Sequence, residues 1–211
     1  MVEDAILIYT SPNSRDKVAL RRELRARRVA VPAPERIRAA ESVADLLQTY
    51  SEFHKPGYVA GYWAIDGELP LHVVQLQLRA DQVWCLPCIQ NDKTLRFSPW
   101  RPGDALVSNR FDIPEPDVSA TSTLAAEEMS VILLPLLGFT RSGLRLGMGG
   151  GFYDRSLAFG QKRSPRPWLL GVGYAFQEVE TLPGDSWDVP LDALVTEQEL
   201  IVCSRAPTMS T

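Results

Sequence analysis

The chain has 211 residues, of which 45% are hydrophobic and 23% charged, and its formal net charge is −4. These values are typical of a globular protein with one sizeable core, and the net acidity argues against a chain that binds nucleic acid over its whole surface. Because the sequence has no apolar run of about 18 residues and begins with acidic rather than basic residues, we expect no membrane span, no signal peptide and a cytoplasmic location.

Helical and strand-like segments alternate along the chain. Residues 14–30 are rich in arginine and are followed by Pro32, which predicts a basic helix that ends before the proline. A second helix is expected over 34–50, with an inner face formed by Ile37, Val43, Ala44 and Leu47. Residues 69–78 are interpreted as helical, although their apolar spacing also allows a strand. Strands are expected at 58–64, 82–88, 131–134, 168–172 and 193–196, and a last helix at 153–159.

This alternation predicts an α/β fold with a largely parallel sheet, in which ligands bind beyond the carboxyl ends of the strands. We expect a single domain over 13–202, an N-terminal extension at 1–12 and a flexible tail at 203–211. Residues 91–126 are rich in Pro, Asp and Ser, and this segment is too long to be a simple connecting loop without a function. They either shape a ligand pocket or cover the edge of the sheet.

The most informative segment is 143–155, GLRLGMGGGFYDR, which places five glycines within nine residues after the apolar run 131–139. Glycine permits positive φ and close approach of the main chain, so successive N–H groups can converge on a phosphate, and a following helix adds positive potential. Arg145 would add a fixed charge, and Asp154 would face a divalent metal. The segment therefore indicates a nucleoside triphosphate with magnesium. It lacks the Gly-Lys-Ser/Thr ending of a P-loop, and a surface turn is the alternative.

Three further sets of residues are candidates for the same site. Lys17 and Arg21 share one helical face and would grip phosphates from the side opposite the glycines; a solvated basic face or an RNA-contacting helix are the alternatives. Asp188 or Asp192, before the last strand, would reach the metal or serve as turn residues. Glu68 follows an aromatic stretch and would accept hydrogen bonds from a flat heterocycle, or else cap a helix.

Cys85 and Cys88 form a C-x-x-C pair that ends a strand-like run rather than opening a helix. Zinc commonly takes four ligands, and the two histidines of the chain have no fitting spacing. We therefore interpret the pair as buried or incidental thiols rather than as a redox or metal site.

Taken in order, these residues resemble the 5-formyltetrahydrofolate cyclo-ligase family (methenyltetrahydrofolate synthetases). The signature of that family is P-x-x-x-F-D-x-x-G-x-R-L-G-x-G-x-G-Y-Y-D-R, and it stands here as residues 135–155. Further matches extend over most of the chain: Lys17-x-x-Leu20-Arg21, the aromatic stretch up to Glu68, Phe97-x-x-Trp100-x-x-Gly103, Phe111-Asp-Ile113-Pro-Glu115-Pro116, Gly171-Val-Gly-Tyr174 and residues 188–197.

The resemblance implies an ATP- and Mg²⁺-dependent ligase of one-carbon metabolism that converts 5-formyltetrahydrofolate to 5,10-methenyltetrahydrofolate, with ADP and phosphate. The formyl oxygen would attack the γ-phosphate to give an imidate phosphate, and N10 would then displace phosphate. It also implies a Rossmann-like, three-layer αβα sandwich of the CoA-transferase type, small-molecule partners without nucleic acid or membrane, and a monomer.

The resemblance also assigns roles residue by residue. The residues implied to bind ATP are Lys17, Arg21, Arg145, Leu146, Gly147, Met148, Gly149, Gly150, Gly151, Phe152 and Tyr153. Those implied to bind the folate are Trp63, Glu68, Phe111 and Tyr153. Asp154 and Asp188 would hold magnesium, and Arg145, Tyr153 and Asp154 would be catalytic.

This chain departs from the family signature at four positions. Thr140 stands where the family has Asp, Gly150 where many members have Lys, Met148 where others have Tyr or Arg, and Phe152 where Tyr is common. One phosphate-facing cation is thereby lost, which leaves Lys17, Arg21 and Arg145 to compensate. A non-catalytic α/β module that binds a nucleotide or sugar phosphate is the alternative function. A magnesium-nucleotide phosphotransferase with another acceptor is a third.

Overall fold

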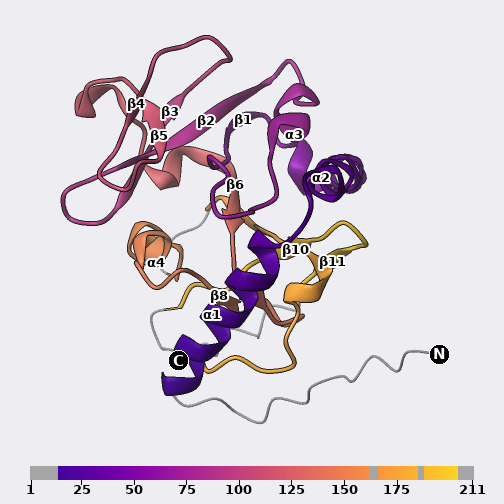
Figure 1. Ribbon diagram of the computed structural model, residues 1–211. Coiled ribbons are helices and arrows are strands. Elements are labelled where there is room, and N and C mark those ends of the chain that lie inside the picture. The colour runs from indigo at the N-terminus through magenta and orange to yellow at the C-terminus, as the bar shows by residue number, and fades with distance from the viewer. Residues whose placement is uncertain (1–13, 162–165, 185–187, 204–211) are drawn as a thin grey trace, which may run out of the picture.

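The computed structural model describes residues 14–161, 166–184 and 188–203. Its centre is a seven-stranded sheet in the order β11-β10-β9-β6-β1-β2-β3 (Figure 1). The five inner strands run parallel, and the edge strands β3 and β11 are antiparallel to their neighbours. The strands of this sheet are β1 (Gly57–Ala60), β2 (Gln82–Ile89), β3 (Leu95–Pro99), β6 (Met129–Pro135), β9 (Trp168–Val172), β10 (Ala193–Val195) and β11 (Leu200–Val202).

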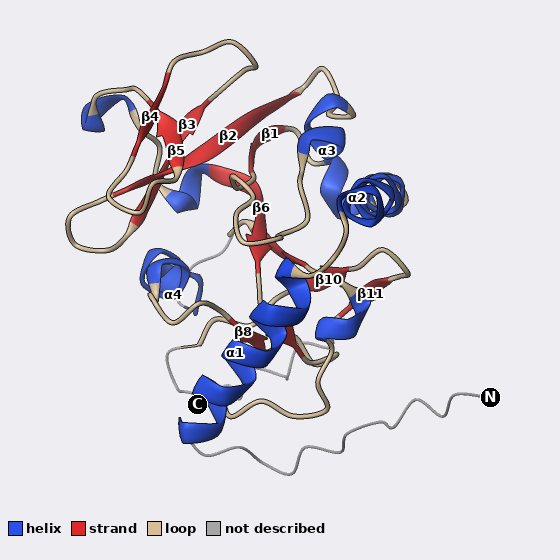
Figure 2. Cartoon of the chain, viewed as in Figure 1, coloured by secondary structure: helices blue, strands red, loops and turns tan. Residues whose placement is uncertain are grey.

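Outside this sheet, the described part of the chain forms four α-helices, five short 3-10 helices and two small hairpins (Figure 2). The helices are α1 (Ser14–Val29), α2 (Ala33–Gln48), α3 (His72–Leu76) and α4 (Phe152–Leu157). The hairpins are β4 (Leu106–Ser108) with β5 (Pro114–Pro116), and β7 (Gly138–Phe139) with β8 (Arg145–Leu146). Among the described residues, no helix is long and apolar enough to cross a membrane.

The alternation of side chains along the strands divides the core into two layers. On β6, Val131 and Leu133 pack in one cluster with the inner face of α2, whereas Ile132 and Leu134 pack in a second cluster with Leu157 of α4. Successive strand residues point to opposite faces, so the sheet has helices on both sides. Figure 1 shows α2 and α3 on one side of β6 and α4 on the other. The predicted three-layer α/β fold is confirmed.

The two helices predicted near the N-terminus are confirmed within two residues at each end. The inner face of α2 consists of Ala39, Ala40, Val43, Ala44 and Leu47, all buried. Ile37 was expected there but is 50% exposed. At about 100° per residue, its side chain lies roughly 90° from the centre of this stripe, so it misses the sheet.

Several strand expectations were wrong in extent. The strand expected over 58–64 ends at Ala60, and the helix expected over 69–78 forms only at 72–76. Residues 91–126 are not one irregular loop, because they contain β3, β4 and β5. The extension expected at 1–12 and residues 204–211 of the expected tail lie outside the described residues, whereas Cys203 is buried.

The glycine segment does not follow the central strand directly. The chain leaves β6, forms the β7–β8 hairpin, and only then enters the glycines at Gly147. The turn of this hairpin depends on Gly143, whose φ is +93° and where a Cβ would lie 2.8 Å from the carbonyl oxygen of Leu191. The hairpin therefore carries the glycines away from the sheet and toward α1.

Candidate active site

The glycine loop, residues 147–151, lies between β8 and α4. Gly149 and Gly151 have φ values of +92° and +66°, which explains why these two positions carry glycine. No atom lies within 4 Å of a Cβ built on Gly147, so the main chain is open to a ligand there. α4 has only six residues, so main-chain N–H groups of the loop, rather than the dipole of a long helix, would bind an anion.

The basic helix α1 packs directly on this loop. Nε of Arg21 donates a 2.9 Å hydrogen bond to the carbonyl oxygen of Gly147, and a Cβ on Gly149 would lie 3.7 Å from the same guanidinium. Leu20 and Leu24 fix the helix by packing with Leu146, which is 3% exposed. The predicted juxtaposition of Arg21 and the glycine segment is thus present. Leu146 can contribute to a ligand only through its main chain.

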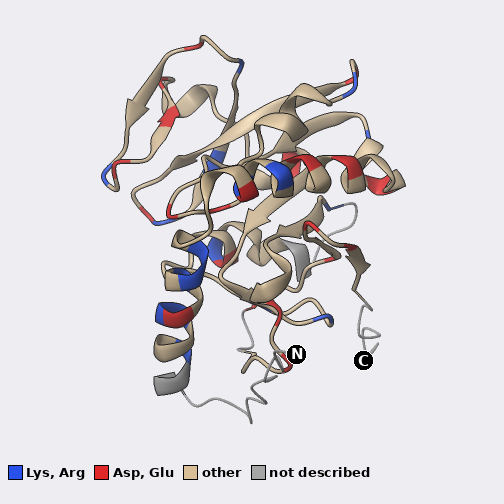
Figure 3. Cartoon of the chain, turned by 45° about the vertical axis from the view of Figure 1, so that its right-hand side comes forward, with Lys and Arg blue, Asp and Glu red and all other residues tan. Residues whose placement is uncertain are grey.

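A cavity of about 740 Å³ opens beside this contact. Four segments line it: α1, the turn after β1, the chain between β6 and β7, and the glycine loop. The lining residues are Arg21, Arg22, Arg25, Ala26, Val29, Asp66, Leu137 and Met148. Lys and Arg residues recur along α1 (Figure 3). Lys17 precedes Arg21 by one turn of that helix and is partly exposed. The cavity therefore combines fixed positive charge with an exposed Met148, a setting suited to a nucleotide with its phosphates.

Arg145 joins the two segments that carry the predicted metal ligands. Its guanidinium donates to the carboxylate of Asp154 through Nη2 and to the carbonyl oxygen of Val189 through Nη1. The Arg145 side chain is 7% exposed and that of Asp154 30% exposed. Asp188 immediately precedes Val189 in sequence, so Arg145 brings the chain segments of both predicted carboxylates to one place.

The buried carboxylate of Glu68 marks a second part of the site. Glu68 is 8% exposed; its Oε2 accepts a 3.1 Å hydrogen bond from the N–H of Ile65, and its Oε1 lies 3.4 Å from Nη1 of Arg28. Burial raises the pKa of Glu68 from 4.5 to about 7, and the charge of Arg28 opposes this shift. Glu68 is therefore not a solvated helix cap but a desolvated acceptor beside a cation.

Tyr153 lies within electrostatic reach of both parts of the site. Burial raises the pKa of Tyr153 first, the negative charge of Glu68 raises it further, and Arg145 lowers it. Its hydroxyl therefore stays protonated at neutral pH. Tyr153, in the first turn of α4, thus interacts electrostatically with both Arg145 and Glu68.

The two aromatic residues expected at the folate site, Trp63 and Phe111, each pack against another ring. The rings of Phe111 and Phe152 meet edge to face with centroids 5.7 Å apart, which brings the hairpin region after β4 against the start of α4. Trp63 packs edge to face on Trp100 at 5.9 Å. Phe111 and Trp63 keep exposed fractions of 51% and 37%. Such partly exposed aromatic faces are suited to a flat ring.

Two of the four departures from the family signature, Gly150 and Thr140, have local structural reasons. A Cβ on Gly150 would lie 2.8 Å from the Phe152 ring, so a larger residue at position 150 would require that ring to move. Thr140 is 4% exposed, and its hydroxyl receives the N–H of Leu144 at 3.3 Å within the hairpin turn. Thr140 therefore closes the turn rather than contacting a ligand.

Among the described residues, no three His, Cys, Asp or Glu side chains form a group that could hold a metal unaided. This is compatible with magnesium, because that ion is commonly bound by one or two carboxylates together with substrate phosphates and water. Asp154, at the end of the glycine loop, fits this donor set. Cys85, Cys88 and Cys203 are buried, and burial raises the pKa of their thiols, as expected for cysteines without a chemical role.

Sequence reasoning missed Arg28, the buried partner of Glu68. Arg28 is 1% exposed, and it follows Leu20 and Leu24 at a spacing of four residues on the same helical face. An arginine that continues an apolar stripe is a signal for a buried charge. The basic character of residues 14–30 concealed it, because Arg28 was one of many arginines. Arg22 and Arg25, which line the cavity, were also not singled out.

Comparison with known proteins places these observations in a family. The model of the 5-formyltetrahydrofolate cyclo-ligase family matches residues 13–197. The chain is 34% identical over 188 residues to the 5-formyltetrahydrofolate cyclo-ligase of Haemophilus influenzae, a match that covers 87% of this chain and 99% of the relative. It is 36% identical over 182 residues to the enzyme of that name from Escherichia coli K12, with 84% and 98% covered.

A solved structure agrees in fold. The NMR structure of the 5,10-methenyltetrahydrofolate synthetase of Aquifex aeolicus superposes with a TM-score of 0.76 at 30% sequence identity. The superposition covers 92% of this chain and 96% of that structure. The similarity therefore includes the sheet, the first helix and the glycine loop, and not one segment alone.

Proposed function

The chain belongs to the 5-formyltetrahydrofolate cyclo-ligase family, and we propose that it closes 5-formyltetrahydrofolate to 5,10-methenyltetrahydrofolate with conversion of ATP to ADP and phosphate. The family is one of ligases, so the chain is an enzyme of that class. The observation that carries this proposal is the contact of Arg21 with the glycine loop at the border of a cavity, with Glu68 buried two residues beyond Asp66 of its lining.

The reaction activates an oxygen that is otherwise a poor leaving group. The formyl oxygen attacks the γ-phosphorus, so that an O–P bond forms and the bond from phosphorus to the ADP oxygen breaks. N10 then attacks the formyl carbon, the C–O bond breaks, phosphate leaves with the former formyl oxygen, and N10 loses its proton to solvent. The protein mainly aligns the reactants and neutralises charge.

The residues around the loop would bind the triphosphate. Main-chain N–H groups of residues 147–151 would contact its oxygens, with Arg21 and Lys17 supplying charge from α1. Arg145 is held at the start of the loop by Val189 and Asp154, which would fix its positive charge close to the γ-phosphate. A guanidinium held in place needs little reorganisation when charge moves during phosphoryl transfer.

Asp154 and Asp188 would hold Mg²⁺ on the phosphates. The ion would neutralise charge that develops as the γ-phosphoryl group moves. Arg145 pairs with the carboxylate of Asp154, and the same carboxylate would help to hold the ion, so Asp154 would have two cationic partners.

The folate would lie against Glu68, Trp63 and Phe111. The carboxylate of Glu68 would accept hydrogen bonds from the pterin amino group and ring N–H, and the exposed aromatic rings would pack on its flat faces. Tyr153 would stand between the formyl group and the γ-phosphate, because its hydroxyl senses both Glu68 and Arg145. As a protonated phenol it would donate a hydrogen bond to the developing oxyanion.

A direct assay tests the proposal. Purified protein with Mg-ATP and 5-formyltetrahydrofolate should produce a species that absorbs in the near ultraviolet, together with one phosphate for each product formed. A binding module would bind nucleotide in calorimetry without either signal. A phosphotransferase with another acceptor would give neither signal with this substrate and would release ADP only when its own acceptor is supplied. The proposal further expects a monomeric cytoplasmic enzyme, which sedimentation and cell fractionation would check.

A further inference from the structure

The guanidinium of Arg28 connects three segments of the chain that are distant in sequence. Its Nε donates to the carbonyl oxygen of Asp66 at 3.0 Å, and its Nη1 donates to the carbonyl oxygen of Leu136 at 3.1 Å. The same Nη1 lies 3.4 Å from Oε1 of Glu68. One side chain from α1 thus holds the turn that follows β1, the chain that follows β6, and the carboxylate between them.

This junction lies where the order of the sheet reverses. From β1 the chain proceeds to β2 on one side, whereas β6 lies on the other side of β1 and leads on to β9. In open α/β sheets, ligands bind in the crevice at such a point. Arg28 therefore lies at the point of the sheet where open α/β folds commonly bind their ligands.

A purely structural role explains Arg28 poorly. A buried guanidinium loses its hydration, and its Nη2 has no hydrogen-bond partner within the described residues. An apolar residue in the stripe formed by Leu20 and Leu24 would avoid this loss. What an apolar residue cannot provide is a positive charge next to Glu68.

Arg28 also fixes the main chain that carries Glu68. A Cβ on Gly67 would lie 2.5 Å from the carbonyl oxygen of Arg28, so the end of α1 and the turn are in direct contact. Tyr174 donates from its hydroxyl to the carbonyl oxygen of Gly67 at 3.1 Å and supports the turn from the side of β9. The position of Glu68 thus depends on Arg28 through both its side chain and its main chain.

We propose that Arg28 is a positioning residue for folate: without touching the substrate, it favours the ionised form of the Glu68 carboxylate and holds that carboxylate in one orientation as the acceptor for the pterin N–H groups. This inference rests on the proposed function for its substrate and on the described contacts for its geometry. It identifies a residue that acts on the folate side while belonging to the helix that binds the nucleotide.

The charged and titratable groups around Glu68 determine the sign of the effect. Arg28 on α1 favours the ionised carboxylate, whereas Asp66 in the same turn disfavours it. Tyr62, after β1, and Tyr153, on α4, also lie within electrostatic reach of Glu68 and are protonated, because burial raises the pKa of both phenols. Since Arg28 is the cation of this group, its removal must raise the pKa of Glu68 further.

The test uses four variants of the full chain: Arg28→Met, Glu68→Gln, the double variant, and Arg27→Met as the control. Arg27 is the adjacent exposed arginine, and its guanidinium lies over the Phe176 ring, away from Glu68. We expect Arg28→Met to raise the KM for 5-formyltetrahydrofolate about tenfold, with the KM for ATP within about twofold. The acidic limb of the pH profile of kcat/KM for the folate should move to higher pH. Arg27→Met should change none of these.

The double variant distinguishes positioning from mere support of the fold. If Arg28 acts through Glu68, adding Arg28→Met to Glu68→Gln should change the folate KM less than about twofold. An equal loss in both backgrounds would overturn the proposal. If Arg28→Met alone fails to fold, two other variants can be compared with the unmodified protein. The double variant leaves no buried unpaired charge. Arg28→Lys keeps the positive charge but lacks the two-pronged guanidinium group.

A measurement without substrate separates this inference from the proposed function. Carboxyl-labelled glutamate followed by carbon NMR, assigned with Glu68→Gln, reports the pKa of Glu68 directly. We expect this pKa to be higher in Arg28→Met than in the unmodified protein and unchanged in Arg27→Met. An unchanged pKa in Arg28→Met contradicts the inference even if the enzyme turns over. If the unmodified protein shows no turnover, that result contradicts only the proposed function.

Discussion

Nε of Arg21 donates to the carbonyl oxygen of Gly147 at 2.9 Å, across 126 positions of sequence. Through this bond the first helix is attached to the glycine loop before any ligand arrives. The guanidinium also lies close to Gly149, where a Cβ would be 3.7 Å away. A phosphate bound by the loop N–H groups would therefore meet a positive charge that is already in place, which lowers the entropy lost on binding.

Replacement of Arg21 should weaken nucleotide binding. In Arg21→Met we expect the KM for ATP to rise about tenfold or more, because a charge-assisted contact to phosphate is lost while the apolar stem is retained. Steady-state kinetics at fixed folate measures this. Arg38→Met removes an exposed arginine from α2 and serves as the control for net charge. An unchanged KM for ATP would place the phosphates elsewhere.

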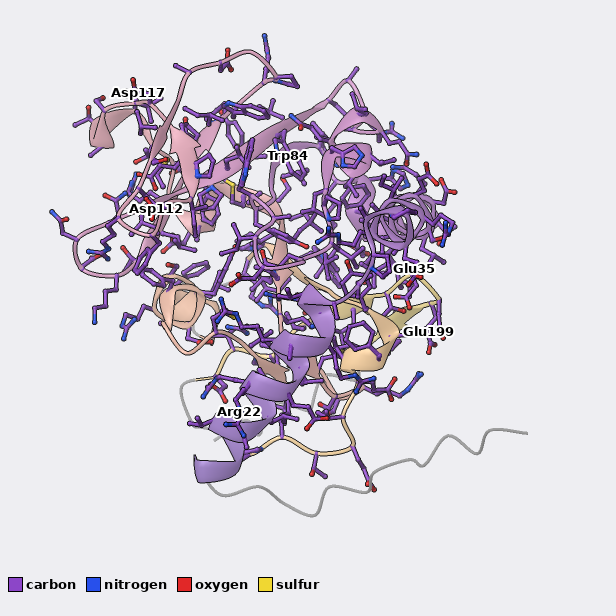
Figure 4. All side chains as sticks on the ribbon, viewed as in Figure 1. Arg22, Glu35, Trp84, Asp112, Asp117 and Glu199 are labelled. Atoms are coloured by element: carbon purple, nitrogen blue, oxygen red, sulfur yellow. The ribbon has the colours of Figure 1, made fainter. Side chains whose placement is uncertain are left out.

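Asp154→Asn should weaken magnesium binding without disrupting the fold. We expect kcat to fall about 100-fold and the magnesium concentration for half-maximal activity to rise, since an amide binds Mg²⁺ less well than a carboxylate. Near-ultraviolet circular dichroism should remain native. Asp117→Asn is the matched control, because Asp117 is exposed and lies away from the glycine loop, in the hairpin region (Figure 4). A wild-type magnesium titration in Asp154→Asn would remove Asp154 from the metal site.

The buried Glu68 should make stability depend on pH. Its pKa is about 7 when folded, against 4.5 for an exposed glutamate, so the folded chain holds the proton more tightly. The stabilisation that comes from protonated Glu68 is present in full below pH 4.5 and is lost as the pH rises through 7. Relative to Glu68→Gln, the free energy of unfolding should therefore decrease by about 3 kcal/mol between pH 4.5 and pH 8.

Urea unfolding of both proteins at a series of pH values measures this difference, and the Gln variant cancels the contributions of other groups. Arg28 is present in both proteins, so its own burial also cancels to first order. A difference that is constant across the range would mean that Glu68 is not desolvated in solution.

The three cysteines should be unreactive in the folded protein. Burial raises the pKa of the thiols of Cys85 and Cys88 to about 12 and that of Cys203 to about 11. The thiolate is the reactive form, so an aromatic disulfide reagent at pH 8 should label these thiols slowly. In urea, all three should react at once. Rapid labelling of the native protein would contradict the burial and reopen a redox role for the C-x-x-C pair.

The sequence predicted those parts of the fold in which local pattern and tertiary packing agree. Residues 168–172 form a strand with the predicted bounds because they are buried on both faces and read as a short apolar run. Two of the strands in 91–126, β4 and β5, were missed because they are only three residues long and partly exposed, and β5 contains two prolines. Neither a hydrophobic period nor a strand composition can be recognised over such a length.

The same distinction applies to the candidate site. Glycines that need positive φ are visible in sequence, so residues 147–151 were found. The pairing of Arg145 with Asp154 was not predicted, because it depends on the hairpin that places β8 beside the start of α4. Arg28 was missed because its place in the apolar stripe of α1 was overlooked among many arginines. Its partner could not be predicted at all, because nothing within α1 indicates that the turn at Asp66–Glu68 packs against it.

Arg21 and Arg28 are seven residues apart on α1, and one reaches the glycine loop while the other reaches the carboxylate. Two turns of helix span about 10 Å along a nearly incompressible axis. α1 therefore acts as a ruler that sets how far the phosphate loop stands from Glu68. An insertion of one residue between these arginines would rotate one of them by about 100° off the shared face. Such a chain could still bind ATP or the folate, but it would not align the two substrates for reaction.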